Sequence, residues 1–191
     1  MASEEDRKAY ESARRHLDNR QFDEAFAQYS RLAEAGDPRS QVFVGWMCSE
    51  GWGTTKDPAR ALEWYRKAAS VGSPAGAYYC AGHAIRERSY EEALKWLYMA
   101  AANEYGPALL WLGILHVRGM GVATDRAKGI KYLERAAATG NFLARRHLGL
   151  MMVRGEFGPL RVIAGLILFP YWAILALVEA LSNGYSDKFM G

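Results

Sequence analysis

Residues 40–72 read SQVFVGWMCSEGWGTTKDPARALEWYRKAASVG, and the small residues of this stretch return at fixed distances along the chain. One further copy is displaced by 68 residues, and another, lying between the two, repeats the second half at a displacement of 32. Self-similarity at such a period is typical of helical solenoids, in which stacked copies of one unit share a continuous core. The recurring pairs at 68 are Gly45 and Gly113, Gly51 and Gly119, Gly53 and Gly121, Asp57 and Asp125, Ala68 and Ala136, Ala69 and Ala137, and Gly72 and Gly140; those at 32 are Ala61 and Ala93, Trp64 and Trp96, Ala68 and Ala100, and Ala69 and Ala101.

Each copy reads as a hairpin of two helices. Apolar side chains at helical spacing run up to Gly51, a helix terminator, and Gly53 closes a tight loop. Asp57 before Pro58 is the expected start of the second helix, as N-cap and first helical residue, and Gly72 ends it. The Ala and Gly positions predict close approach of the paired helices, and the Trp and Tyr positions predict packing between neighbouring hairpins.

The Gly-Trp-Gly or Gly-Met-Gly loop, the Asp that follows it and the segment ALEWYRKAA together resemble the Sel1-like repeat, a relative of the tetratricopeptide repeat. The resemblance covers about residues 23–155 and implies an all-α, right-handed α-solenoid of about four to five helical hairpins. The middle copy departs from the pattern, with Ala81 in place of the family glycine and a short connection at 86–90. The first hairpin, residues 5–36, also lacks the glycine loop. The last copy begins like the others and then changes character.

That change introduces a stretch without charge at residues 162–178. As a helix it would be about 25 Å long, slightly less than the roughly 30 Å hydrocarbon core of a bilayer. Pro170 interrupts it, which predicts a kinked or divided helix. Three structures remain open: a single span, a re-entrant or interfacial segment, and a buried cap on the preceding hairpin or on a partner. The expected organisation is a repeat domain at 1–156 and a hydrophobic segment with a short tail at 157–191. The residues expected to face the membrane are Val162, Ile163, Leu166, Ile167, Phe169, Trp172, Ile174, Leu175 and Leu177.

The charges around this stretch predict its orientation. Four arginines precede it, whereas one acid and one base follow it, so the positive-inside rule keeps the repeat domain in the cytoplasm. The polar, acidic N-terminus has no apolar core of a secretory signal. We therefore expect a membrane-associated, tail-anchored protein. The flanking charges are Arg145, Arg146, Arg154, Arg161, Asp187 and Lys188.

The composition argues against several function classes. The net charge of +3 is spread over interleaved acids and bases, which does not suit nucleic-acid binding. Cys48 and Cys80 are expected to be small buried side chains in a reducing compartment. Four dispersed histidines, with no metal-binding or phosphate-binding motif, predict no enzyme, no metal and no cofactor. Some secreted relatives are credited with lactam hydrolysis, but their paired cysteines and export signal are missing here.

Two sets of residues on the first helices of the copies are the candidate binding site. The first, here called the aromatic column, lies two residues before the repeat glycine. The second, the basic column, lies five residues after it. An alternative for each is structural: rings at helical spacing are often core, and arginines near helix C-termini complement the helix dipole or meet anionic lipid. The aromatic column is Phe43, Tyr79, Trp111 and His147; the basic column is Glu50, Arg86, Arg118 and Arg154; Trp46, Tyr78 and Arg146 flank them.

Together these features predict a scaffold or adaptor that recruits a partner protein at the cytoplasmic face of a membrane. Rings offer rigid apolar area and guanidinium groups pair with carboxylates, so the partner is expected to be a peptide segment or an integral membrane protein. The alternative is a soluble scaffold whose hydrophobic tail is buried in an oligomer or an obligate complex. An enzyme of the lactam hydrolase type is a third hypothesis. The sequence predicts no oligomeric state.

Overall fold

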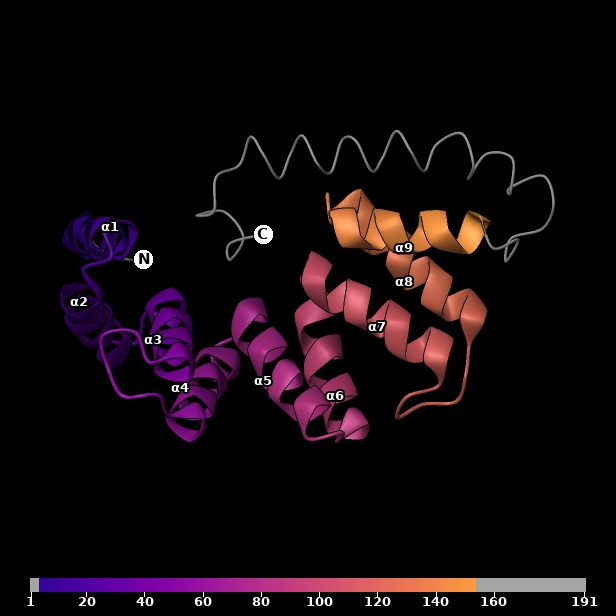
Figure 1. Ribbon diagram of the computed structural model, residues 1–191, viewed down its shortest axis with the longest axis horizontal. Coiled ribbons are helices and arrows are strands. Elements are labelled where there is room, and N and C mark those ends of the chain that lie inside the picture. The colour runs from indigo at the N-terminus through magenta and orange to yellow at the C-terminus, as the bar shows by residue number, and fades with distance from the viewer. Residues whose placement is uncertain (1–3, 154–191) are drawn as a thin grey trace. The chain divides into compact units, whose positions relative to one another are not determined.

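Helices account for all the regular structure in the part of the chain that the structure describes, residues 4–153 of a computed structural model (Figure 1). The predicted all-α helical repeat is therefore confirmed; its right-handedness stays a prediction. Arg154 and the apolar stretch 162–178, with all the residues expected to face the membrane, lie outside the described residues. The helices are α1 Glu4–Asp18, α2 Phe22–Glu34, α3 Pro38–Glu50, α4 Pro58–Ser70, α5 Pro74–Arg86, α6 Tyr90–Ala101, α7 Gly106–Arg118, α8 Arg126–Ala138 and α9 Phe142–Val153.

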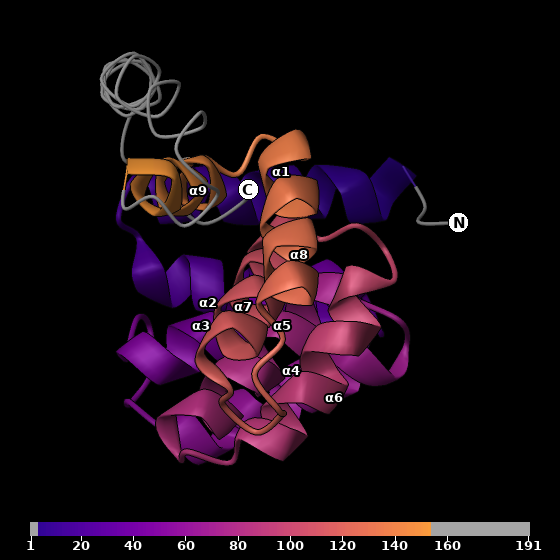
Figure 2. The same ribbon diagram turned by 90° about the vertical axis from the view of Figure 1, so that its right-hand side faces the viewer.

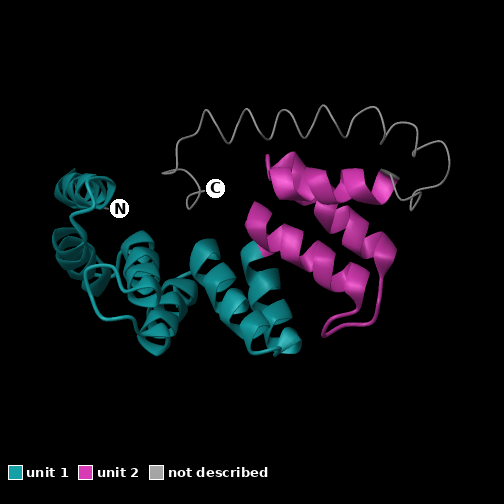
Figure 3. Cartoon of the chain, in the orientation of Figure 1, with its two compact units in different colours: residues 1–100 teal, residues 101–191 magenta. Residues whose placement is uncertain are grey.

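The chain divides into two compact units, residues 1–100 and 101–191 (Figure 3). In the first unit α1 packs against α2, α2 against α3, α3 against α4 and α4 against α5, and α3 also meets α5. In the second unit α8 packs against both α7 and α9, and Figure 2 views α9 close to end-on beside α8. No helix between residues 4 and 153 has both the length and the apolar character needed to cross a bilayer.

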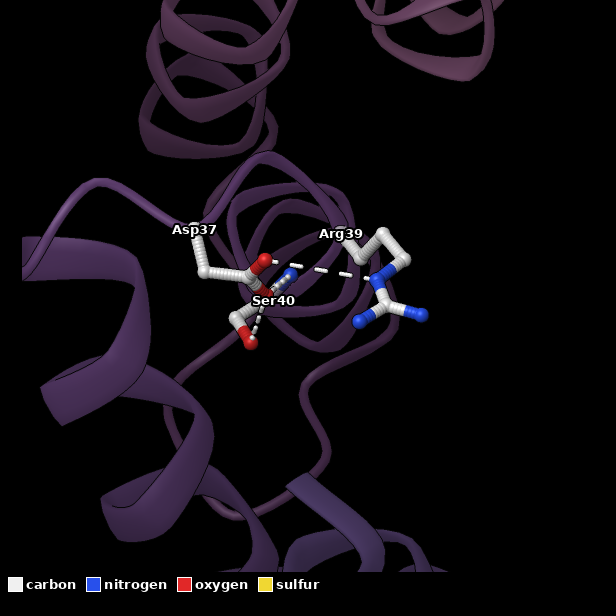
Figure 4. A network of polar contacts seen from close by, with 3 residues as sticks. All are labelled: Asp37, Arg39 and Ser40. Atoms are coloured by element: carbon white, nitrogen blue, oxygen red, sulfur yellow. Dashed lines mark hydrogen bonds and ion pairs between the residues drawn. The ribbon is translucent and has the colours of Figure 1, made fainter. Parts of the chain in front are cut away.

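Helix starts follow the predicted chemistry. The Asp57 carboxylate accepts a hydrogen bond from the Arg60 backbone N–H at 3.0 Å, and Pro58 begins α4. Asp125 caps α8 in the same way at 2.9 Å. Asp37 does so for α3, where its Oδ2 accepts from the backbone N–H of Ser40 at 2.8 Å and from the Ser40 hydroxyl at 2.5 Å (Figure 4). Because these bonds satisfy N–H groups that have no partner within the helix, they fix where each helix begins.

The glycine loop after α3 requires its glycines for two different reasons. Gly51 ends the helix with φ +79°, a left-handed backbone that disfavours side chains. At Gly53 a Cβ would collide with the carbonyl oxygen of Phe22, so the loop backbone touches α2 directly. The connection at 86–90 has no such loop: α5 ends at Arg86 and α6 begins at Tyr90, as predicted for a tetratricopeptide-like hairpin.

Small residues let paired helices approach closely, as the repeat pattern predicted. A Cβ on Gly45 of α3 would meet the Tyr65 ring of α4 at 2.6 Å. A Cβ on Gly113 of α7, 68 residues later, would meet Leu133 of α8 at the same distance. Ala68 is fully buried in the first unit and Ala136 in the second. The core therefore runs along the seam between the two helices of each hairpin.

Candidate protein-binding face

The aromatic column lies on successive first helices of the hairpins. Phe43, Tyr79, Trp111 and His147 belong to α3, α5, α7 and α9, and each side chain is half-buried. The basic column begins seven residues later on the same helices, with Glu50, Arg86 and Arg118 all exposed. Seven residues are close to two turns, so on each helix the two columns share a face. Rings and charges therefore alternate along that face.

Two rings of the aromatic column stack on a tyrosine of the preceding hairpin. Phe43 lies parallel to Tyr29 of α2, with centroids 4.8 Å apart. Tyr79 lies nearly parallel to Tyr65 of α4, with centroids 4.7 Å apart, and burial followed by the neighbouring Tyr78 raises its pKa to about 12. The two pairs are displaced by 36 residues, so the contact is part of the repeat. The predicted packing of tyrosines between neighbouring hairpins is confirmed at these joints. Phe43 and Tyr79 keep partial exposure, whereas Tyr29 and Tyr65 are buried.

Phe43 has an additional ring neighbour that the sequence pattern did not indicate. Tyr10 of α1 meets the Phe43 ring edge-on at 6.1 Å and the Tyr29 ring at 5.6 Å. The Arg39 guanidinium covers the Tyr10 ring at 4.7 Å. A pocket opens beside this group of rings, lined by Asp6, Arg7, Tyr10, Leu32, Ala35, Gly36, Asp37, Pro38 and Arg39. The sequence predicted a first hairpin at residues 5–36, but none of the recurring positions falls within α1, so periodicity did not indicate this ring contact.

At the corresponding joint of the second unit, a leucine stands where the first unit has Tyr65. Leu133, which corresponds to Tyr65, is buried in the core. His147 has a lowered pKa because of burial, and then because of the positive charges of Arg118 and Arg146. A member of the basic column and a predicted flanking residue thus both influence this member of the aromatic column electrostatically.

In the first unit two members of the basic column influence a buried phenol. Both Arg86 and Glu50 act electrostatically on the Tyr65 hydroxyl, whose pKa is raised above its ordinary value chiefly by burial. Since Tyr65 also stacks on Tyr79, the two columns meet at this tyrosine. The sequence indicated each column but not this shared partner on α4.

Side chains suited to catalysis are not gathered in the described residues. Among residues 4–153 no group of three or more His, Cys, Asp and Glu side chains could hold a metal ion. Cys48 and Cys80 are both unpaired and buried, and burial raises the pKa of Cys80 to about 12. His116 is buried in α7 and stacks on Tyr132 of α8, so it is a packing residue of the hairpin.

The fold and its small-residue seams define a helical repeat protein of the tetratricopeptide-like class. The model of the Sel1 repeat matches residues 38–73, 75–105 and 106–141, and the chain therefore belongs to the Sel1-repeat family. Members of this family are in general scaffolds for protein interactions and are typically not catalysts themselves.

Several known proteins are similar to this chain. The Arabidopsis thaliana ERAD-associated E3 ubiquitin-protein ligase component HRD3B is 34% identical over 104 residues, which are 54% of this chain and 17% of HRD3B. The protective antigen c5321 of uropathogenic Escherichia coli has 26% identity and a TM-score of 0.71, over 78% of this chain and 34% of c5321. A Sel1 repeat protein from Oxalobacter formigenes, at 22% identity, has a TM-score of 0.75 over 85% of this chain and 68% of its own. The chain thus spans about a sixth of HRD3B and a third of c5321.

Proposed function

We propose that this protein is a non-enzymatic scaffold that captures segments of a partner protein on those faces of its first helices that carry residues of the aromatic and basic columns. The observation that carries the proposal is a shared helix face on α5 and on α7: a half-buried ring, Tyr79 or Trp111, lies two turns before an exposed guanidinium group, Arg86 or Arg118. Rings fixed by stacking lose little conformational entropy when a partner binds, and arginine forks recognise carboxylates. Buried aromatic anchors surrounded by polar groups are the usual composition of a protein-binding hot spot.

We further propose that capture takes place at the cytoplasmic face of a membrane. Support for this part comes from the sequence: the uncharged stretch 162–178 and the arginines that precede it. Carbonate extraction of membranes from cells that express the full chain tests it. Retention in the membrane pellet is expected. Release into the supernatant would favour the alternative, in which the hydrophobic tail is buried in an oligomer or an obligate complex.

The binding face is tested by photo-crosslinking in native membranes. A benzoylphenylalanine residue replaces Trp111 on α7, and a matched variant carries it in place of Tyr98, an exposed ring on α6 outside both columns. The position 111 variant is expected to give a discrete partner adduct that Arg118→Glu removes, whereas the position 98 variant gives none. The same adduct from both positions would show that the columns do not form the binding face.

A further inference from the structure

The pocket beside Tyr10 holds a guanidinium group that is fixed by two neighbours. Arg39 lies over the Tyr10 ring, with its guanidinium carbon 4.7 Å from the ring centroid, and its Nε lies 4.0 Å from Oδ1 of Asp37. In Figure 4 the dashed line from Asp37 ends on Nε, and no drawn residue is joined to the two terminal nitrogens. Within residues 4–153 the structure gives these two nitrogens no acceptor. Arg39 therefore presents a fork of N–H donors whose position is already set.

The fork belongs to a pocket that also has apolar surface. The pocket lies between α1, the end of α2 and the start of α3, and its volume is about 370 Å³. Leu32, Ala35 and Pro38 give it apolar surface, to which the Tyr10 ring adds. This volume is at the lower end of the range for ligand pockets, so it suits one or two side chains of a peptide.

The fork is the charged group of the pocket lining that still lacks a counterpart in the described part of the chain. Oδ2 of Asp37 accepts hydrogen bonds from the backbone N–H and the hydroxyl of Ser40, and Asp6 has an interaction of its own. Arg7 has Glu11 as its ion-pair partner at 4.0 Å. What the lining leaves open is a fork of N–H donors, which favours a negatively charged acceptor in whatever enters the pocket.

The pocket is continuous with the aromatic column. Arg39 is four residues before Phe43 on α3, so the two side chains share a helix face. The Tyr10 ring connects them, because it lies under the Arg39 guanidinium and meets the Phe43 ring edge-on at 6.1 Å. The pocket therefore extends the proposed binding face at the beginning of α3. The other copies hold no base at the position of Arg39, where their residues are Ala75, Pro107 and Leu143.

We propose that this pocket binds an Asp or Glu side chain of the partner segment at the Arg39 fork, with the neighbouring apolar side chain of the segment on the surface of Leu32, Ala35 and Pro38. The inference rests on the proposed function and specifies the chemistry of the partner. The two terminal nitrogens of a guanidinium match the two oxygens of a carboxylate. Because the Tyr10 ring and Asp37 already hold the guanidinium, little side-chain entropy is lost when the carboxylate binds.

An anionic membrane surface is the competing source of negative charge. Lipid head groups attract any exposed base, so they require the charge of Arg39 but neither its planar fork nor the apolar surface beside it. The presence of both features in one pocket favours a peptide. Liposomes that contain phosphatidylserine are included in the experiment to separate the two.

The experiment measures, by fluorescence anisotropy, the binding of a peptide with one Glu-Leu pair in a Gly-Ser sequence to the full chain in neutral detergent micelles. Arg39→Lys keeps the charge and loses the fork. It is compared with Arg39→Gln and with Arg66→Gln, which removes an exposed charge of α4 outside the pocket. Both Arg39 variants are expected to weaken binding about fivefold or more, with less than about a twofold change for Arg66→Gln.

Two matched peptides are tested on the wild type, so this part does not depend on the folding of any variant. One carries Gln-Leu and the other Glu-Ala, and both are expected to bind more weakly than the Glu-Leu peptide. Equal binding of the Gln-Leu peptide would overturn carboxylate recognition, and equal binding of the Glu-Ala peptide would overturn the role of the apolar surface.

Three further results would overturn the proposal: no binding of the Glu-Leu peptide, wild-type binding by Arg39→Lys, or binding to the liposomes alone that Arg39→Lys retains and Arg39→Gln loses. The photo-crosslinking test at position 111 reports separately, because Trp111 lies on α7 and outside the pocket. A crosslink at 111 without carboxylate recognition at Arg39 would leave the scaffold and remove the role of the pocket. The absence of both would reject the proposed function as well.

Discussion

The Tyr65 and Tyr79 rings lie nearly parallel, 13° apart in plane and 4.7 Å between centroids, and they join the second helix of one hairpin to the first helix of the next. Tyr29 and Phe43 repeat this relationship 36 residues earlier, at 5° and 4.8 Å. The joint between consecutive hairpins in the first unit is thus a ring pair. Phe43 and Tyr79 are therefore both structural contacts between hairpins and parts of the proposed binding face.

A double-mutant cycle of Tyr65→Leu and Tyr79→Leu measures the coupling free energy between the two stacked rings. Leucine is the residue that the chain itself uses at the corresponding position 133. We expect a coupling free energy of about 0.5–1.5 kcal/mol in urea unfolding, because stacked rings stabilise one another beyond the area that they bury. A cycle of Tyr65→Leu with Tyr98→Leu is the control and should give a value near zero. Equal values from the two cycles would mean that stacking adds nothing.

The two N-cap aspartates, Asp57 and Asp125, should each contribute measurably to the free energy of unfolding. Asp57→Ala leaves the Arg60 backbone N–H without its acceptor, and Asp125→Ala does the same to Lys128. We expect each to lower the free energy of unfolding by about 1 kcal/mol, and the Asn variants to lower it by less, since Asn also caps well. Asp23→Ala is the control, because Asp23 lies in the first turn of α2 and is not its N-cap. A loss at Asp23 as large as at Asp57 would point to helix-dipole effects instead of capping.

Gly72, which follows the C-terminal end of α4, offers a test of backbone strain. Gly72 has φ +87°, and a Cβ there would meet nothing within 4 Å, so the cost of a side chain is conformational alone. We expect Gly72→Ala to lower the free energy of unfolding by about 1–2 kcal/mol and Gly72→Asn by less, because Asn tolerates a left-handed backbone. Equal losses for Ala and Asn in thermal unfolding would contradict this account.

Glu104 occupies the corresponding position of the middle copy, with φ +53°. Its exposed ion pair with Arg135 is worth no more than about 1 kcal/mol, which offsets part of the strain. Glu104→Gly should therefore be more favourable in an Arg135→Gln background, where no ion pair is lost, than in the wild type. Thermal unfolding of the four variants of this cycle measures the difference.

His147 should make stability depend on pH. In the unfolded chain its pKa is the ordinary 6.5, whereas burial and the charges of Arg118 and Arg146 lower it in the folded state. Below pH 6.5 the unfolded chain binds more protons than the folded chain, so the free energy of unfolding decreases as the pH is lowered from 6.5 to the folded pKa. The stabilisation that comes from keeping His147 neutral is complete above pH 6.5. Between about pH 7.5 and about pH 5.5 the wild type should lose more stability than His147→Gln in urea unfolding. Equal losses would show that His147 does not contribute. His116, whose pKa is also lowered by burial, accounts for a residual effect in both proteins.

The two cysteines should react only when the protein opens. Burial raises the pKa of both thiols, and the Cys80 value of about 12 leaves very little thiolate at neutral pH. We expect Ellman's reagent to modify Cys48 and Cys80 slowly in the native protein and rapidly in urea, with rates that follow the unfolding transition. Fast modification of either thiol in the native protein would contradict its burial.

The sequence predicted the hairpins well because local chemistry defines them. Asp57 and Pro58 begin α4, and Gly51 ends α3. Gly45 is required where α3 touches α4. Each of these signals depends on residues that lie close together in the sequence or within one hairpin. The candidate site was predicted less completely. The columns follow from periodicity, but their partners, such as Tyr10 on Phe43, come from other helices and depend on packing direction.

The prediction also missed the charges that influence His147. Arg118 and Arg146 lie in different copies at unrelated repeat positions, so no fixed displacement links them. Their electrostatic effect on His147 depends on how the helices of the second unit pack, which a residue pattern does not encode. The prediction of membrane-facing residues stays a prediction.

The ring joint has a consequence for engineering. Residues 38–73 carry one half of a joint at Phe43 and the other half at Tyr65, so the segment ends in a surface complementary to its own beginning. A tandem duplication of this cassette would place a Tyr65 ring against a second Phe43, a pairing that the wild type already makes with other tyrosines. The segment can therefore pack against a copy of itself, and a lengthened protein with this duplication is expected to unfold cooperatively.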